Sequence, residues 1–331
     1  MSGVPNWRGF RVSLDDLVFV GSGLNRPECV LCNAAGNIYT ADWRGGVACT
    51  RSDGTSELFA GRHPRADLVL RPNGIALRRS GAFLVAQLGA DDGGVYELSR
   101  EGGVRPFLEA IDGRPLEPTN FVYEDALGRV WLTISSRHRP RHLAFRADIA
   151  DGFIALVDGG GARIVADDIG YTNEVGIDPT GEWLYVNETF GRRLSRFPVR
   201  GNGDLGAKEV VAQFGSGTFP DGLTFDVEGG VWITSVVSNR VIRVAPDGTQ
   251  TLLIEDADPG HLAEVEAAYV AGKMDRPHLE KMTGRRLKNI SSLAFGGPDR
   301  RTAYLGCLLG DSIASFRAPI AGAAPPHWRY P

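Results

Sequence analysis

Residues 219–235 read FPDGLTFDVEGGVWITS, and this pattern decides the fold because it returns along the whole chain. A polar residue opens an alternating apolar strand, a turn with Gly follows, and a second strand often carries an aromatic residue. The other copies are RPECVLCNAAGNIYTAD (26–42), RPNGIALRRSGAFLVAQ (71–87), PTNFVYEDALGRVWLT (118–133), YTNEVGIDPTGEWLYVN (171–187) and NISSLAFGGPDRRTAYLG (289–306). A unit repeated at this period is typical of β-propellers.

The six copies align on the residue that opens each first strand. These residues are Glu28, Asn73, Asn120, Asn173, Asp221 and Ser291, and they are 45, 47, 53, 48 and 70 residues apart. Most copies are followed by a further hairpin, such as NRVIRVAPDGTQTLLI (239–254) with its Pro-Asp-Gly turn. We therefore expect an all-β chain in which residues 1–331 form one domain, a six-bladed β-propeller with four-stranded blades.

Two segments fall outside the repeat. FRVSLDDLVFV (10–20) is expected to add a strand to the last blade beside SIASFRAP (312–319) and so to close the ring. The long last spacing holds a helical insertion at about 258–284, where HLAEVEAAYVAGKM (261–274) has an apolar helical face. This helix is expected to pack against the outer edge of a blade, or alternatively to cover the channel as a lid.

Composition narrows the possible partners. Lys and Arg number 36 against 40 Asp and Glu, which gives a net charge of -4 and no excess of positive charge for a nucleic acid. The opening MSGVPNWRGF lacks the features of a signal peptide, and no apolar run is long enough for a membrane-spanning helix. We expect a cytoplasmic protein with no membrane partner, and its oligomeric state stays open. The four cysteines, Cys29, Cys32, Cys49 and Cys307, are expected to be reduced packing residues.

The residues that open the first strands are the candidate functional site. In a propeller these strands lie nearest the axis, so their first residues point toward one small volume. Five of the six are Glu, Asn, Asn, Asn and Asp, and carboxylate and amide oxygens are the ligands of a hard divalent cation. Each of these residues alone is also a common turn residue. Together they favour a metal centre, because two buried acids would repel each other without a cation between them.

The chain also resembles the senescence marker protein, gluconolactonase and luciferin-regenerating enzyme family, from Pro-Glu-Cys at Pro27 to PIAGAAPPHW (319–328) and including FGGPDRRTAYLG (295–306). The resemblance implies that Glu28, Asn173 and Asp221 bind one divalent metal ion (Ca, Mg, Mn, Zn or Fe(II)). It also implies that Asn120 contacts the substrate, and Asn73 has the same phase. The family's Glu-Gly-Pro opening is Pro-Glu-Cys here, and Phe121 follows Asn120, so the substrate pocket need not match that for sugar lactones.

The function implied by the resemblance is a metal-dependent lactonase that opens a sugar lactone or another small cyclic ester. The metal ion would polarise the ester carbonyl and activate water, and Asp221 would act as general base. A strictosidine-synthase-like or other non-hydrolytic propeller enzyme and a non-catalytic metal-binding scaffold are the alternatives, because a propeller fold alone does not fix a function.

Several further residues are weaker candidates. The basic run from Arg137 to His142 is either a solvated loop or a site that recruits an anionic substrate. Other side chains that could line the pocket are Asp42, Trp43, Glu188 and Arg192. The six histidines show no metal-binding spacing, and we expect them at the surface.

Overall fold

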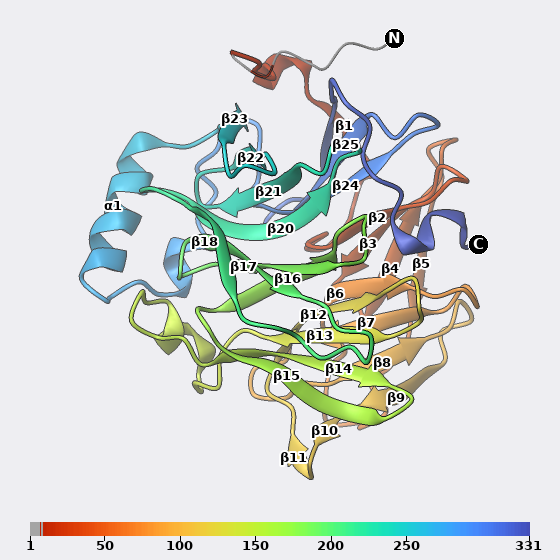
Figure 1. Ribbon diagram of the computed structural model, residues 1–331. Helices are drawn as coiled ribbons and strands as arrows, with labels where there is room; N and C mark the ends of the chain where they lie inside the picture. Colours follow the sequence, from red (N-terminus) through yellow and green to blue (C-terminus); the bar gives the residue numbers. More distant parts are fainter. Residues whose placement is uncertain (1–6, 8) are drawn as a thin grey trace.

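The computed structural model describes residue 7 and residues 9–331, and its strands form the expected six-bladed β-propeller (Figure 1). Six four-stranded antiparallel sheets follow one another along the chain and around the ring. The opening segment MSGVPNWRGF, in which no signal peptide is expected, includes residues 1–6 and 8, and these lie outside the described residues.

The first three blades are built from consecutive strands. Blade one contains β2 (Val30–Cys32), β3 (Ile38–Asp42), β4 (Gly46–Thr50) and β5 (Ser56–Ala60). Blade two contains β6 (Pro72–Leu77), β7 (Phe83–Gln87), β8 (Val95–Leu98) and β9 (Val104–Leu108). A small hairpin of β10 (Ala110–Ile111) and β11 (Arg114–Pro115) precedes blade three, which contains β12 (Thr119–Glu124), β13 (Val130–Ile134), β14 (Gly152–Asp158) and β15 (Gly161–Ile169).

The last three blades include the ring closure. Blade four contains β16 (Thr172–Ile177), β17 (Trp183–Glu188), β18 (Arg193–Pro198) and β19 (Glu209–Gln213). Blade five contains β20 (Phe219–Phe225), β21 (Val231–Val236), β22 (Arg240–Val244) and β23 (Gln250–Ile254). Blade six contains β24 (Ile290–Gly296), β25 (Thr302–Cys307), β26 (Ile313–Arg317) and, as its outermost strand, β1 (Val18–Val20).

The closure by β1 confirms the sequence prediction. Val18 pairs with Ser315 and Val20 with Ile313, so the N-terminal strand completes the blade that the C-terminal strands begin. The residue before β1, Leu17, is buried in the same hydrophobic cluster as strands of blade six. Both ends of the ring are therefore held in one sheet.

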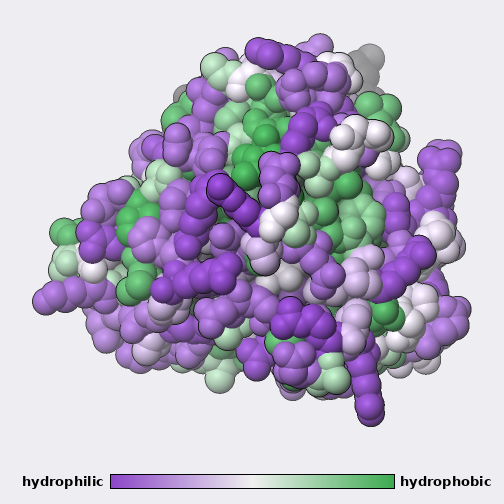
Figure 2. Space-filling view, turned by 90° about the horizontal axis from the view of Figure 1, so that it is seen from below, coloured by the Kyte–Doolittle hydropathy of each residue, from purple (hydrophilic) through white to green (hydrophobic). Residues whose placement is uncertain are grey.

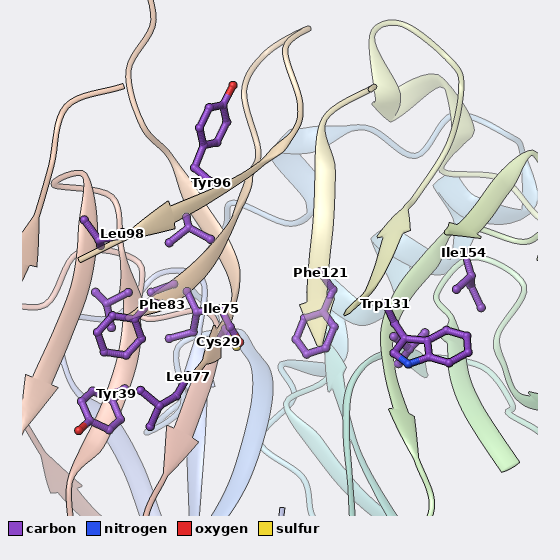
Figure 3. Close-up of a cluster of buried hydrophobic side chains, with 14 of the residues drawn as sticks. Cys29, Tyr39, Ile75, Leu77, Phe83, Tyr96, Leu98, Phe121, Trp131 and Ile154 are labelled. Atoms are coloured by element: carbon purple, nitrogen blue, oxygen red, sulfur yellow. The ribbon is translucent and has the colours of Figure 1, made fainter. Parts of the chain in front are cut away.

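The first strands form a closed inner ring. Contacts run from β2 to β6, from β6 to β12, and onward through β16, β20 and β24 back to β2. The hydrophobic core lies between the blades, because each sheet carries apolar residues on both of its faces. At the interface of blades one and two, the Tyr39 ring of β3 lies 5.2 Å from the Phe83 ring of β7, beside Leu77 of β6 (Figure 3).

The turns between first and second strands repeat one tertiary contact. The carboxylate of Asp125 accepts a 2.9 Å hydrogen bond from the indole of Trp131, and Asp226 accepts the same bond from Trp232. Both tryptophans are fully buried, and their N–H groups therefore need these partners. The aromatic residue of the sequence repeat thus anchors the turn of its own blade.

The helices lie in the connections. The α-helix α1 (Pro259–Val270) occupies the insertion between β23 and β24, and the short 3-10 helices are Leu14–Asp16, Arg141–Ala144, Arg276–His278 and Pro326–Arg329. None of the helices that the structure describes combines the length and apolar character that a membrane crossing requires. Hydrophilic residues cover most of the face seen in Figure 2, with hydrophobic residues gathered in patches between them.

Candidate functional site

The predicted site residues occupy equivalent places at the starts of the inner strands. Asn73, Asn120 and Asn173 are each the second residue of their strand, Asp221 is the third residue of β20, and Glu28 lies two residues before β2. The alignment that the sequence repeat predicted therefore matches the structure.

A β-bulge lies at this position in five of the six blades. The pairing of first and second strands shifts between Pro72 and Ile75, Thr119 and Phe121, Thr172 and Val175, Pro220 and Leu223, and Ile290 and Leu293. A bulge leaves an extra residue unpaired and re-aims its side chain. The bulges thus free the site residues from the regular pleat.

The amide side chains are held by hydrogen bonds from their Nδ2 atoms. Asn73 donates to the carbonyl and the side-chain oxygen of Asn120, at 3.0 and 3.1 Å. Asn120 donates to the hydroxyl of Ser135 at 2.7 Å, and Asn173 donates to that of Thr189 at 2.9 Å. These bonds fix the orientation of each amide from the blade that carries it or the next blade.

The two carboxylates of the site are buried and lie close enough to interact. Glu28 and Asp221 are only 7% and 5% exposed. Burial raises the pKa of Asp221 well above its usual value, and the negative charge of Glu28 raises it further. Burial also raises the pKa of Glu28, while the positive charges of Arg26 and Arg141 lower it. Glu28 is therefore near enough for its charge to act on Asp221.

Unsatisfied oxygen atoms indicate that this site suits a cation. Oε2 of Glu28 and Oδ1 of Asn73 and Asn173 are buried without a hydrogen-bond partner among the described residues. Buried acceptors normally have a donor or a metal ion. The described residues contain no cluster of three or more His, Cys, Asp and Glu side chains suited to a metal. The candidate site instead combines two carboxylates with amide oxygens, which is the donor chemistry of hard cations.

The sixth position has a structural role. The hydroxyl of Ser291 donates a 2.8 Å hydrogen bond to the backbone carbonyl of Glu28, across the junction of blades six and one. Ser291 therefore helps to position Glu28 where the ring closes.

Glu174 is a site residue that the sequence did not reveal. It follows Asn173 in the bulge, is buried, and accepts a 3.0 Å hydrogen bond from the backbone N–H of Leu223. Burial raises its pKa to about 8, and its charge raises the pKa of Asp221. Strict strand alternation places Glu174 opposite Asn173. The register shift between Thr172 and Val175 interrupts that alternation, and the only signal in the sequence was an acid beside a candidate ligand.

One cavity lies along the inner strands, and another lies beside the first and last blades. One of about 470 Å³ is lined by residues that follow the site positions, including Cys29, Phe121 and Glu174. The other, of about 660 Å³, lies at the rim where the first strands begin and is lined by Arg26, Trp43 and Arg276, among others. Trp43 therefore lines a cavity near the site, as the sequence suggested.

The inserted helix packs on this rim rather than on the outer edge of a blade. The Tyr269 hydroxyl donates to the carbonyl of Phe190, and Glu266 pairs with Arg192. Glu266 also accepts a 2.7 Å hydrogen bond from the N–H of Gly217, just before β20. The helix α1 therefore covers the ends of blades four and five beside the site (Figure 1).

Other sequence expectations have mixed outcomes. All four cysteines are buried and unpaired, as predicted. Glu188 is fully buried and accepts hydrogen bonds from Arg193, Ser195 and Gly170, so it is a structural residue. The expectation of surface histidines is wrong for His63 and His261, which are buried. The His63 ring packs against the Tyr96 ring with their centres 4.5 Å apart, and Nε2 of His261 lies 3.1 Å from the backbone carbonyl of His278.

Comparison with known proteins gives matches over much of the chain. The family described as SMP-30/Gluconolactonase/LRE-like region matches residues 71–256. A 6-deoxy-6-sulfogluconolactonase from Pseudomonas putida is 30% identical over 176 residues, 52% of this chain and 56% of that protein. A pentonolactonase from Haloferax volcanii is 26% identical over 275 residues, 77% of this chain and 79% of that protein.

Solved structures share the fold. A calcium-binding protein, regucalcin, from Agrobacterium tumefaciens superposes with a TM-score of 0.65 and 19% sequence identity. The superposition covers 97% of this chain and 98% of that one. At this level of identity, the likeness concerns the propeller architecture alone.

Proposed function

The chain belongs to the SMP-30/gluconolactonase/LRE-like family, and on this premise we propose that it is a lactonase that opens a small cyclic ester. In this proposal Glu28, Asn173 and Asp221 hold one divalent metal ion, and Asn120 and Asn73 contact the substrate. Two curated relatives named as lactonases support the reaction class, although the match spans only 56% of the first one's length. Residues 1–331 act as one domain.

The observation that carries the proposal is the set of buried oxygen atoms without partners around two neighbouring carboxylates. Oε2 of Glu28 and Oδ1 of Asn173 flank Asp221, whose charged form is disfavoured by burial and by Glu28. A divalent cation satisfies these oxygens and offsets both negative charges. A scaffold has no need of two acids in this position.

The donor set also bears on which metal is bound. Carboxylate and amide oxygens suit calcium, magnesium and manganese better than thiophilic metals. Zinc and ferrous iron also accept such ligands, usually together with histidine. We therefore rank the hard cations first and keep all five as candidates.

The residues of the chain divide the chemistry of ester opening among them. A bound divalent ion supplies Lewis acidity toward the ester carbonyl and lowers the pKa of bound water. Asp221 accepts the proton of the attacking water, and the water oxygen forms a bond to the carbonyl carbon. The bond from that carbon to the ring oxygen then breaks, and the ring oxygen takes up the proton from Asp221. The product is the open hydroxy acid.

The asparagines orient the substrate. Oδ1 of Asn73 is free to accept a hydrogen bond from a substrate hydroxyl, because its Nδ2 is already bonded to Asn120. Asn120 is fixed in turn by Ser135, which limits its motion. Orientation by such pre-positioned groups lowers the barrier of a reaction without any new covalent step.

The test is hydrolysis of a panel of sugar and aromatic lactones after chelator treatment. We expect activity to be lost and then restored by one or more of calcium, magnesium, manganese, zinc and ferrous iron. Asp221→Asn should lower kcat/KM by about 100-fold or more, whereas Asp91→Asn at an exposed position should not. A hydrolysis rate that changes neither on removal of the metal nor in Asp221→Asn would falsify the proposal.

A further inference from the structure

Three arginines lie in connections at the end of the propeller where the first strands begin. Arg26 precedes Glu28 by two residues, Arg141 begins the 3-10 helix between β13 and β14, and Arg276 begins the one that follows α1. These connections belong to blade one, blade three and the insertion before blade six. The fold therefore brings them together from distant parts of the sequence.

Backbone and aromatic contacts, without a direct ion pair among the described residues, hold Arg26 in place. The N–H of Glu28 donates a 2.7 Å hydrogen bond to the carbonyl of Arg26, and this tight turn joins the arginine to the proposed metal ligand. The guanidinium lies 4.5 Å from the centre of the Trp43 ring, which supports its planar face. Its Nε is buried and has no hydrogen-bond partner among the described residues. The edge of the guanidinium thus remains available to a ligand.

Arg141 and Arg276 lie on neighbouring 3-10 helices. Nε2 of His142 lies 3.7 Å from the carboxylate of Asp275, which connects the two helices. Arg276 lines the 660 Å³ cavity together with Arg26. Arg141 precedes His142 and Arg276 follows Asp275, so this contact brings the two arginines into one part of the rim.

The local charges do not balance. Arg276 has a partner in Glu280 at 3.2 Å, whereas Arg26 and Arg141 form no direct ion pair in the part of the chain that the structure describes, and the acids whose charges act on Arg26 are Glu28 and Asp221. In the proposed function, Glu28 and Asp221 are neutralised by the divalent ion. Arg26, Arg276 and Lys288 line the cavity against the two acids Glu280 and Asp311, so its lining carries a net positive charge.

We propose that Arg26, Arg141 and Arg276 bind an anionic substituent of the substrate, so that the preferred substrate is a lactone carrying a carboxylate, phosphate or sulfonate group away from the reacting ester. This inference rests on the proposed lactonase function and names its substrate class. Guanidinium groups match these oxyanions because they donate two parallel hydrogen bonds. The basic loop that contains Arg141 is thereby assigned the recruiting role that its sequence suggested.

The decisive experiment compares two lactones that differ only in an exocyclic anionic group. We expect the wild-type protein to favour the anionic lactone by about tenfold or more in kcat/KM, and Arg141→Gln or Arg26→Gln to remove most of that preference. Arg146→Gln is the matched control, because Arg146 lies in the same loop and pairs with Asp148. It should keep the wild-type ratio. Equal hydrolysis of both lactones by the wild-type protein would overturn the inference while leaving the lactonase function intact.

A binding measurement separates this inference from the reaction. Glucose 6-phosphate and glucose have no ester to open, and calorimetry can compare their affinities in the metal-loaded protein. We expect tighter binding of glucose 6-phosphate, weakened at high salt and in Arg141→Gln, and partly retained in Arg141→Lys. Glucose 6-sulfate and glucuronate extend the comparison to the other oxyanions. No difference between the charged and neutral sugars in the wild-type protein would contradict the inference.

Discussion

Asp221 lies beside Glu28 and Glu174, so its negative charge is unfavourable in the protein without metal. Its pKa is raised by burial first and by these two acids next. When folding raises the pKa of an acid, the protein loses stability as pH rises from the acid's unfolded pKa toward its folded pKa. In the proposed function, this same carboxylate contributes stability only when the ion is bound.

This balance predicts opposite effects of Asp221→Asn with and without metal. Without metal near pH 7.5, we expect the variant to be more stable than the wild-type protein by at least about 1.4 kcal/mol, the equivalent of one pKa unit. With saturating metal, the wild-type protein should gain stability and the variant should not. Urea unfolding of both proteins in chelator and in metal measures the four values. A metal-free variant less stable than the metal-free wild-type protein contradicts this explanation.

His327, which lines the 470 Å³ cavity, provides a second pH dependence. Burial lowers its pKa from 6.5 to about 4. A histidine kept neutral by folding contributes stability that is present above its unfolded pKa and is lost as pH falls toward its folded pKa. Between pH 7 and pH 4, wild-type stability should therefore fall by up to about 3 kcal/mol more than that of His327→Gln. Chemical unfolding at several pH values tests this, and parallel curves for the two proteins would exclude it.

At the residue scale, the sequence predicted positions better than surroundings. The repeat alone aligned Glu28, Asn173 and Asp221, because each opens an equivalent strand. It did not reveal Glu174 or the placement of Arg26, since one depends on a bulge and the other on a turn supported by Trp43. Such local departures from regular geometry leave little trace in residue type.

The bulges make the inner strands the functional elements. They separate the site residues from the ladder, while the rest of each strand keeps its pairing to the second strand. This arrangement brings the backbone of blade six so close to Gly222 that a side chain does not fit there. A Cβ at this position would lie 2.5 Å from the carbonyl oxygen of Ser291 and from Cα of Ser292 in the next blade.

Gly222→Ala should therefore damage both stability and activity. The backbone of blade six must move away, which we expect to cost about 2 kcal/mol or more and to displace Asp221, with a loss of at least about tenfold in kcat/KM. Gly201→Ala is the control, because nothing lies within 4 Å of its added Cβ. Thermal unfolding and lactone hydrolysis measure both effects. A Gly222→Ala protein with wild-type stability would show that the blades do not approach so closely.

At the scale of whole elements, the sequence predicted the type of an element better than the contacts that it makes. The Asp-Gly after β20 resembled a common turn, whereas Gly222 is needed for contact with blade six. The helix α1 was predicted from its periodicity, but its place on the rim depends on Arg192 and Phe190, which belong to another blade. The hydrophobic periodicity of one element does not reveal which distant element it contacts.

At the scale of the whole molecule, the ring explains why six distant segments form one site. The inner strands contact one another in sequence and close from β24 to β2, and β1 completes the last blade. Because every blade contributes one residue at the same depth, the axis collects carboxylates and amides that no single blade could assemble. The 70-residue last spacing provides the helix and the arginine of the insertion.

The most direct test of this account is the metal content of the purified protein. After dialysis against a mixture of divalent ions, elemental analysis should find one tightly held ion per wild-type chain and none in the Glu28→Gln/Asp221→Asn double variant. Circular dichroism must show that the double variant retains its β-sheet structure. A folded double variant that still holds one ion, or a wild-type protein that holds none, would contradict the assignment of Glu28, Asn173 and Asp221 as a metal site.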